Sequence, residues 1–175
     1  LTPLLLGVTY KWVDPQGQLG PDEVLTQLRA GQGQAYSPTT FYPTGGSRAV
    51  WFWLDVPAQA AAEPSVLLIA YPGLNSLRLF EPGAKGAPWH VLAAGDALAV
   101  SAWPIPHLFP AMPLAAASEP DRKLLLRVQH SHPVTFPWRI AERAAFEAGH
   151  QRLVLVLGMY LGLVALVVIL GAMNA

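Results

Sequence analysis

Hydrophobic and polar residues alternate through much of the chain between Tyr10 and Ile140, a pattern typical of β-strands with one buried face. The clearest example is the segment AVWFWLDV at residues 49–56. Side chains of a strand point alternately to its two faces, which predicts one row of Val50, Phe52, Leu54 and Val56 and an opposite row of Trp51, Trp53 and Asp55. The first row predicts a core face, and a later segment repeats it with Leu124, Leu126 and Val128.

Short segments of this kind recur, each bounded by Gly, Pro, Asn, Asp or Ser. The predicted strands are Val8–Val13, Ala49–Val56, Val66–Tyr71, Ser76–Phe80, Trp89–Leu92, Ala97–Ala102, His107–Leu114, Lys123–His130 and Val134–Ile140. Their spacing predicts a mainly β domain in which two sheets close over one core, as in a jelly-roll β-sandwich.

One short helix is predicted at Pro21–Ala30. Proline suits the first helical position, acidic residues follow it in the first turn, and Gly31 is placed to end the helix. Val24, Leu25 and Leu28 fall on one face, so we expect this helix to cover an open end of the sandwich.

The C-terminal segment Leu153–Met173 contains no charged residue and no proline. A helix over it would be about 31 Å long at about 1.5 Å per residue, close to the roughly 30 Å hydrocarbon core of a bilayer. The alternative is a buried helix of a soluble core, but such helices are usually shorter and carry a polar stripe. We therefore predict a transmembrane helix. Gly158 and Gly162 either allow a second helix to approach closely or reflect the frequency of glycine in membrane helices.

These patterns predict three parts: a β-sandwich domain at residues 1–141, a helical connector at 142–152 and the transmembrane helix at 153–173. No Gly/Pro-rich linker precedes the membrane segment, and only Gly149 interrupts the connector. The connector is thus either a stiff element that transmits a signal or a simple spacer. The first residues, LTPLLLGV, are either the tail of a secretion signal or the first strand of the domain.

Composition narrows the function. The chain has 175 residues, no cysteine and a formal net charge of zero, with 13% charged residues. The β region is the size of one ordinary domain. A near-neutral chain does not predict a basic surface for nucleic acid, and the absence of cysteine excludes disulfides and thiol nucleophiles.

Catalytic motifs are absent from the sequence: there is no P-loop, no G-x-G-x-x-G, no G-x-S-x-G and no H-E-x-x-H. We expect no enzymatic activity, although a carboxylate pair brought together by the fold would escape this test. His130 and His132 lie on the same side of an extended chain, a spacing that can bind zinc, but a closed site needs further ligands. We expect a turn at this position, with no metal and no cofactor.

Aromatic residues suggest a binding site. The two tryptophans opposite the predicted core row can stack on sugar rings or other planar ligands, or a helix or loop can cover them as ordinary packing. An arginine on a neighbouring strand can add a polar contact or belong to a solvated face. A tryptophan and a histidine also flank the prolines that follow Gly95-Asp96. The candidate ligand-binding residues are Trp51, Trp53, Arg78, Trp103, His107 and Arg127.

Several landmarks occur in a familiar order. They are Asp14-Pro15-x-Gly17-x-Leu19, the tryptophan strand, Tyr71-Pro72-x-Leu74-x-x-Leu77-x-Leu79-Phe80, Gly95-Asp96, Trp103-Pro104-Ile105-Pro106-His107, Leu124-x-Leu126-Arg127-Val128 and Phe136-Pro137-x-x-Ile140. In this order the chain resembles the type-2 extracellular domain of bacterial seven-transmembrane receptors with diverse intracellular signalling modules. The resemblance extends from about Tyr10 to Met173.

The resemblance implies a jelly-roll sandwich similar to carbohydrate-binding modules, on the periplasmic side of the bacterial inner membrane. It also implies that the transmembrane helix is the first of seven, with an enzymatic output module such as a diguanylate cyclase or histidine kinase further downstream. Two arginines common in the family are missing, since Trp53 and Leu54 occupy one position and Trp103 the other. If those arginines bind an anion in relatives, this chain is expected to prefer a less charged ligand.

Two functions follow from these observations. The first is a ligand-sensing input domain for carbohydrate or another small molecule, acting alone or as a homodimer. The second is a membrane-anchored accessory or structural subunit that binds a protein partner. Arg143 and Arg152 on the supposed outer side oppose the positive-inside tendency, so the resemblance decides the predicted topology.

Overall fold

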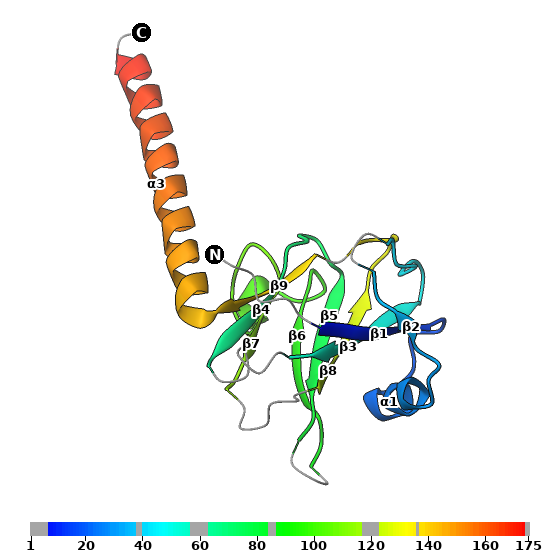
Figure 1. Cartoon of the computed structure of the whole chain (residues 1–175). Helices are drawn as coiled ribbons and strands as arrows, with labels where there is room; N and C mark the ends of the chain where they lie inside the picture. Colours follow the sequence, from blue (N-terminus) through cyan, green and yellow to red (C-terminus); the bar gives the residue numbers. More distant parts are fainter. Residues whose placement is uncertain are drawn as a thin grey trace. The chain divides into compact units, whose positions relative to one another are not determined.

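The computed structural model describes residues 7–37, 40–56, 63–83, 87–116, 123–135 and 137–173. The chain forms two compact units, Leu1–Ala141 and Glu142–Ala175. The elements are β1 (Gly7–Asp14), α1 (Pro21–Arg29), β2 (Gln34–Ala35), β3 (Ala49–Asp55), β4 (Ser65–Ile69), β5 (Ser76–Glu81), β6 (His90–Ala94), the 3₁₀ helix η1 (Val100–Ala102), β7 (Ala111–Leu114), β8 (Lys123–Gln129), β9 (Trp138–Glu142) and α3 (Arg143–Met173) (Figure 1). Residues 1–6, for which the sequence left two interpretations, lie outside the described residues.

The first unit is a mainly β domain built from two sheets, which confirms the predicted fold class. A six-stranded sheet has the order β2-β1-β3-β8-β5-β6, and a three-stranded sheet has the order β7-β4-β9. Neighbouring strands β1 and β3, β3 and β8, and β5 and β8 are antiparallel. The jelly-roll pattern of connections stays a prediction.

The main core lies between the two sheets, and it contains the predicted row of residues. Val50, Phe52, Leu54, Leu124, Leu126 and Val128 are all buried there, as expected from their alternation. Leu67, Ile69 and Met112 contribute from the three-stranded sheet. We call this cluster the inner core. Its formation follows from the period-two pattern, because every second residue of β3 and β8 faces the opposing sheet.

Helix α1 forms where the sequence predicted it, but it covers a different surface. Pro21 occupies the start of the helix, and the Glu23 side chain accepts a hydrogen bond from the Gly20 amide at 2.8 Å. Val24 and Leu28 are buried with Trp51 in a second apolar cluster. The helix therefore covers the second face of the six-stranded sheet rather than an open end of the sandwich, because that face carries large apolar side chains of its own.

Three strand predictions need correction, and one short strand was missed. The segment Ala97–Ala102 is not a strand: a turn at Gly95 leads into η1. Gly95 has a φ of 120°, and the Asp96 amide donates to the Leu74 carbonyl at 2.7 Å, which turns the chain away from a sheet. In addition, β7 and β9 begin later than predicted, at Ala111 and Trp138, and the two-residue β2 was missed because it has no alternation to detect.

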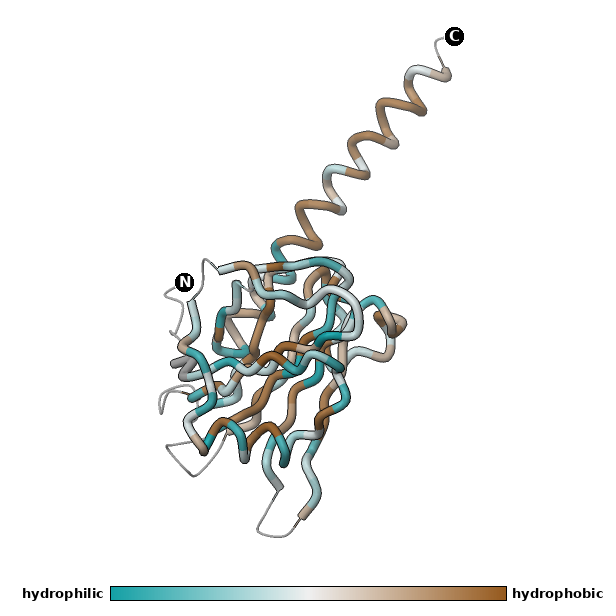
Figure 2. Tube along the Cα trace, turned by 90° about the vertical axis from the view of Figure 1, so that its right-hand side faces the viewer, coloured by the Kyte–Doolittle hydropathy of each residue, from teal (hydrophilic) through white to brown (hydrophobic). Residues whose placement is uncertain are grey.

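Helix α3 is continuous from Arg143 to Met173. Its first turn carries an ion pair between Arg143 and Glu147, with 2.8 Å between Nε and Oε1. Within the described residues, α3 is the one helix long and apolar enough to cross a membrane. Figure 2 shows hydrophobic residues along most of its length. The predicted subdivision into a connector and a span stays a prediction.

Candidate ligand-binding face

The six-stranded sheet has a second face, pointing away from the inner core, which we call the outer face. The strand register aligns four of its residues in one row across β1, β3, β8 and β5. Trp12 is opposite Trp51, Trp51 is opposite Arg127, and Arg127 is opposite Arg78. Because residues directly opposite each other on neighbouring strands share a face, three of the six candidate residues are brought together here.

Trp51 is fully buried, with 0% of its surface exposed. It packs beneath α1 with Val24 and Leu28, and its ring centroid lies 5.2 Å from that of Phe80. In this structure Trp51 is therefore packed beneath α1 and offers no open platform to a ligand. Its indole N–H nevertheless has no hydrogen-bond partner among the described residues.

Trp53 lies two residues along β3 and is only half-buried. Its ring centroid is 6.4 Å from that of Tyr10, and the Lys123 ammonium lies 5.1 Å from the ring centroid. Tyr10 itself is 41% exposed. This part of the outer face combines accessible aromatic surface with a cation, as a planar polar ligand would require.

Arg127 is the buried cation of the row, with 9% of its surface exposed. Its guanidinium carbon lies 5.7 Å from the centroid of the Trp51 ring. It donates hydrogen bonds to the Gly17 carbonyl at 2.6 Å and to Gln129 Oε1 at 2.8 Å. Burial lowers the pKa of Arg127, the charge of Arg78 lowers it further, and Asp14 acts in the opposite direction.

The loop that receives Arg127 is fixed by Asp14. The Asp14 carboxylate accepts hydrogen bonds from the amides of Gln16 at 3.1 Å and Leu19 at 2.8 Å. Gly17 has a φ of 65°, and a side chain there would collide with the Ser47 carbonyl. Glycine is therefore required for the turn that presents its carbonyl to the arginine.

Arg78 is exposed on β5 beside the buried arginine. Among the described residues its side chain forms no hydrogen bond or ion pair. Two guanidinium groups are thus adjacent in the sheet, one buried and one open to solvent. From the sequence, each arginine alone was a candidate polar contact for a ligand. The strand register places the two arginines next to each other.

Trp103 and His107 do not join this face. Trp103 is 7% exposed and belongs to the inner core, and its indole N–H donates to the Gly95 carbonyl at 3.3 Å. His107 accepts a hydrogen bond from the Phe109 amide at 3.1 Å. The first therefore holds the Gly95 turn against the core, and the second orders its own loop, so the six candidates do not form one site.

Sequence reasoning missed two tryptophans of the outer face. Trp12 lies beside Trp51 in the register, and alternation in the first predicted strand gave the signal for it. Trp89 precedes β6, and its indole N–H donates to Asp22 Oδ1 at 2.9 Å. This bond ties the first turn of α1 to the β5–β6 hairpin, a contact between residues 67 positions apart.

The two histidines of the HSH segment lie close to each other, with 6.0 Å between the ring centroids of His130 and His132. His132 Nδ1 is 2.9 Å from the Ser131 hydroxyl. Burial lowers the pKa of His130, and His132 adds to this effect, whereas Asp96 opposes it. Within the part of the chain that the structure describes, no group of three or more His, Cys, Asp or Glu residues is placed to hold a metal.

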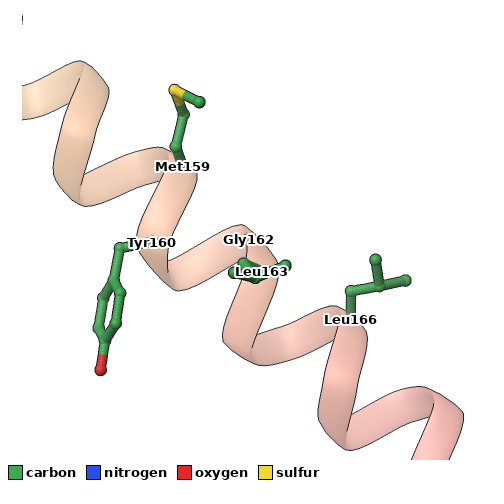
Figure 3. Close-up of a pocket in the computed structure, with 5 residues that line it drawn as sticks. All are labelled: Met159, Tyr160, Gly162, Leu163 and Leu166. Atoms are coloured by element: carbon green, nitrogen blue, oxygen red, sulfur yellow. The ribbon is translucent and has the colours of Figure 1, made fainter.

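Helix α3 also carries an apolar hollow beside Gly162. Figure 3 shows the residues that line it, with Met159 and Leu166 projecting from one side of the helix and Tyr160 from the other. The lining residues are Met159, Tyr160, Gly162, Leu163 and Leu166. Its apolar lining suits lipid or another helix rather than a polar ligand.

A two-sheet β-domain followed in the chain by a helix long and apolar enough to cross a membrane defines a membrane-associated domain. Residues 8–142 match the family described as 7TMR-DISM extracellular 2. The chain belongs to this family and provides an extracellular sensor domain of a membrane receptor. No curated protein matches the chain.

Proposed function

We propose that this chain is the ligand-sensing input domain of a bacterial signalling receptor, located on the periplasmic side of the inner membrane. The family match supports an extracellular sensor domain, and the outer face supplies the ligand-binding surface. The ligand is a small molecule with a planar or ring-shaped part, such as a carbohydrate. The observation that carries this proposal is the half-buried Trp53, flanked by Tyr10 and Lys123 beside the arginine row.

Strand β3 connects the proposed binding surface with the strand that precedes the membrane helix. Trp53 lies on its outer face, whereas the neighbouring Phe52 points into the inner core. Phe52 contacts Trp138 of β9 edge-to-face, with 4.8 Å between ring centroids. Since β9 ends at Glu142 and α3 begins at Arg143, a displacement of β3 can bias β9 without passing through a flexible loop.

The proposed mechanism is a population shift. A ligand that binds one arrangement of the outer face better than another favours that arrangement by its difference in affinity. We expect the two arrangements to differ in the position of helix α1. This helix packs on Trp51, and the hydrogen bond from Trp89 holds its first turn. The role assigned to this chain is binding, and any enzymatic output belongs to other parts of the receptor.

The test is a thermal-shift screen of the purified chain in detergent against mono- and oligosaccharides, amino acids and organic acids. At least one compound should raise Tm, because a ligand that binds only the folded state stabilises it. Trp53→Ala should remove that shift, and Phe41→Ala, at a residue 70% exposed that is not part of the apolar cluster beneath α1, should retain it. If no compound acts and cross-linking in membranes instead captures one defined protein, the chain is an accessory subunit.

A further inference from the structure

The outer face concentrates hydrogen-bond donors and positive charge at one position. Arg78 and Arg127 are directly opposite each other on antiparallel strands. Like charges in this arrangement oppose strand pairing. The sheet keeps two cations side by side at a cost to strand pairing, which points to a role for the pair in binding.

Asp14 favours the charged form of Arg127, but its hydrogen bonds go to backbone amides. Asp14 is 2% exposed, and both of its oxygens accept backbone amides. Arg127 bonds only neutral acceptors, the Gly17 carbonyl and the Gln129 amide oxygen. Among the described residues, no carboxylate forms an ion pair with either arginine. The two arginines therefore retain their positive charge. Together they carry ten N–H donors, and most of these remain able to bind an external acceptor.

Two indoles continue the row without supplying an acceptor. The N–H groups of Trp12 and Trp51 are buried and have no partner among the residues described. Trp51 is completely buried and lies beneath the Arg127 guanidinium. Unpaired buried donors are costly and uncommon in folded proteins. These two indole donors stay beneath the surface, so the donors of the row that a ligand can reach are those of the arginines.

We propose that Arg78 and Arg127 form an oxyanion-binding site, which takes a carboxylate or phosphate group of the ligand. The guanidinium fork matches the oxygens of either group in bidentate fashion. Arg127 is the buried anchor, held in place by its bonds to Gly17 and Gln129, and the exposed Arg78 is the entry side. Trp53 and Tyr10, two residues along their strands from Trp51 and Trp12, contact the remainder of the ligand.

This inference rests on the proposed sensing function and makes its ligand acidic. It differs from the expectation that two missing family arginines imply a less charged ligand. Those arginines belong to the positions of Trp53 or Leu54 and Trp103, whereas the present pair lies on β5 and β8. Positive charge is therefore available on the outer face from other strands.

The experiment compares matched probes on the full chain in detergent. D-glucuronate and D-glucose share a sugar ring but differ in a carboxylate, and inorganic phosphate tests the second oxyanion. Binding is measured by calorimetry and thermal shift at about 20 mM and about 300 mM NaCl, because salt screens an exposed charge pair. Glucuronate or phosphate should bind and glucose should bind more weakly, with affinity decreasing at high salt.

Arg78→Gln should weaken binding of the acidic probe about tenfold or more, because a charge-assisted hydrogen-bond pair is lost. This exposed variant should fold normally. Arg139→Gln, at an exposed arginine of β9 in the other sheet, is the matched control and should bind as the original chain does. Arg127→Lys keeps the charge but loses the fork, so it should also weaken binding.

Binding of glucuronate without phosphate would assign a carboxylate site, and the reverse would assign a phosphate site. Equal binding of glucose and glucuronate that is insensitive to Arg78→Gln would overturn the oxyanion site while leaving ligand sensing in place. Binding of neither acidic probe at low salt would overturn it as well, and the broader compound screen would then decide the sensing function separately.

Discussion

Phe52 is the residue at which the packing of the domain can be tested most sharply. Its side chain is fully buried at the centre of the inner core. It contacts Tyr42 edge-to-face at 5.1 Å between ring centroids, and Trp138 in the same manner at 4.8 Å. A third edge-to-face pair joins Phe52 to Tyr36 at 6.0 Å, so Phe52→Ala should remove a large buried side chain and three favourable aromatic pairs.

The expected loss can be worked from these contacts. Truncating a buried phenylalanine to alanine costs about 3–5 kcal/mol. Each well-oriented aromatic pair contributes about 0.5–1.5 kcal/mol beyond the buried area, which places Phe52 in the upper half of that range. We predict a decrease of about 4–5 kcal/mol in the free energy of unfolding, against a total of about 5–15 kcal/mol for an ordinary domain.

The assay is urea unfolding of the chain in detergent, followed by near-ultraviolet circular dichroism. Phe41→Ala is the matched control, since Phe41 is 70% exposed. The control should change the free energy of unfolding by about 0.5 kcal/mol or less, as is usual at exposed positions. A loss below about 1 kcal/mol for Phe52→Ala would refute the burial argument.

Three further changes test other parts of the domain. Leu28→Ala, at a residue on the buried face of α1 that is 3% exposed, should cost about 2–5 kcal/mol in the same unfolding assay. Burial and His132 lower the pKa of His130, against the opposing effect of Asp96. The unfolded chain therefore binds a proton at this histidine first, and the stability of the fold should decrease as the pH drops through the ordinary pKa of 6.5. In His130→Gln the urea midpoint should decrease less steeply over the same pH range. Burial raises the pKa of Tyr36 to about 12. The unfolded chain therefore loses the phenol proton first, and the stability of the fold should decrease above pH 10.0. Tyr36→Phe should lose less stability over the same alkaline range, and an unchanged pH profile in this variant would contradict the raised pKa of Tyr36.

The inner core was predictable because it depends on local alternation. Every second residue of β3 and β8 is apolar, and burial of that row needs only a second sheet. Helix α1 was predictable from Pro21 and the acidic residues that follow it. The 3₁₀ helix η1 was not, because its apolar segment resembles a strand until the tertiary bonds of the Gly95 turn are known.

The outer face was only partly predictable. Alternation correctly placed Trp51 and Trp53 on the face of β3 opposite the inner core. It predicts which face of the sheet a side chain lies on, but not whether that face is exposed to solvent. Trp51 is buried because α1 rests on it, a contact between segments far apart in the sequence. The Arg78–Arg127 pair likewise depends on the register of β5 against β8, which no local pattern specifies.

The central claim is that this β-domain lies outside the membrane and is anchored there by α3. The chain contains no cysteine, so a single introduced thiol reports its own location without a background. Leu108→Cys, at a residue 62% exposed, should react with a membrane-impermeant maleimide in intact spheroplasts. Met173→Cys, at the other end of α3, should react only after permeabilisation. The opposite pattern, with Leu108→Cys protected until the membrane is opened, would contradict the account.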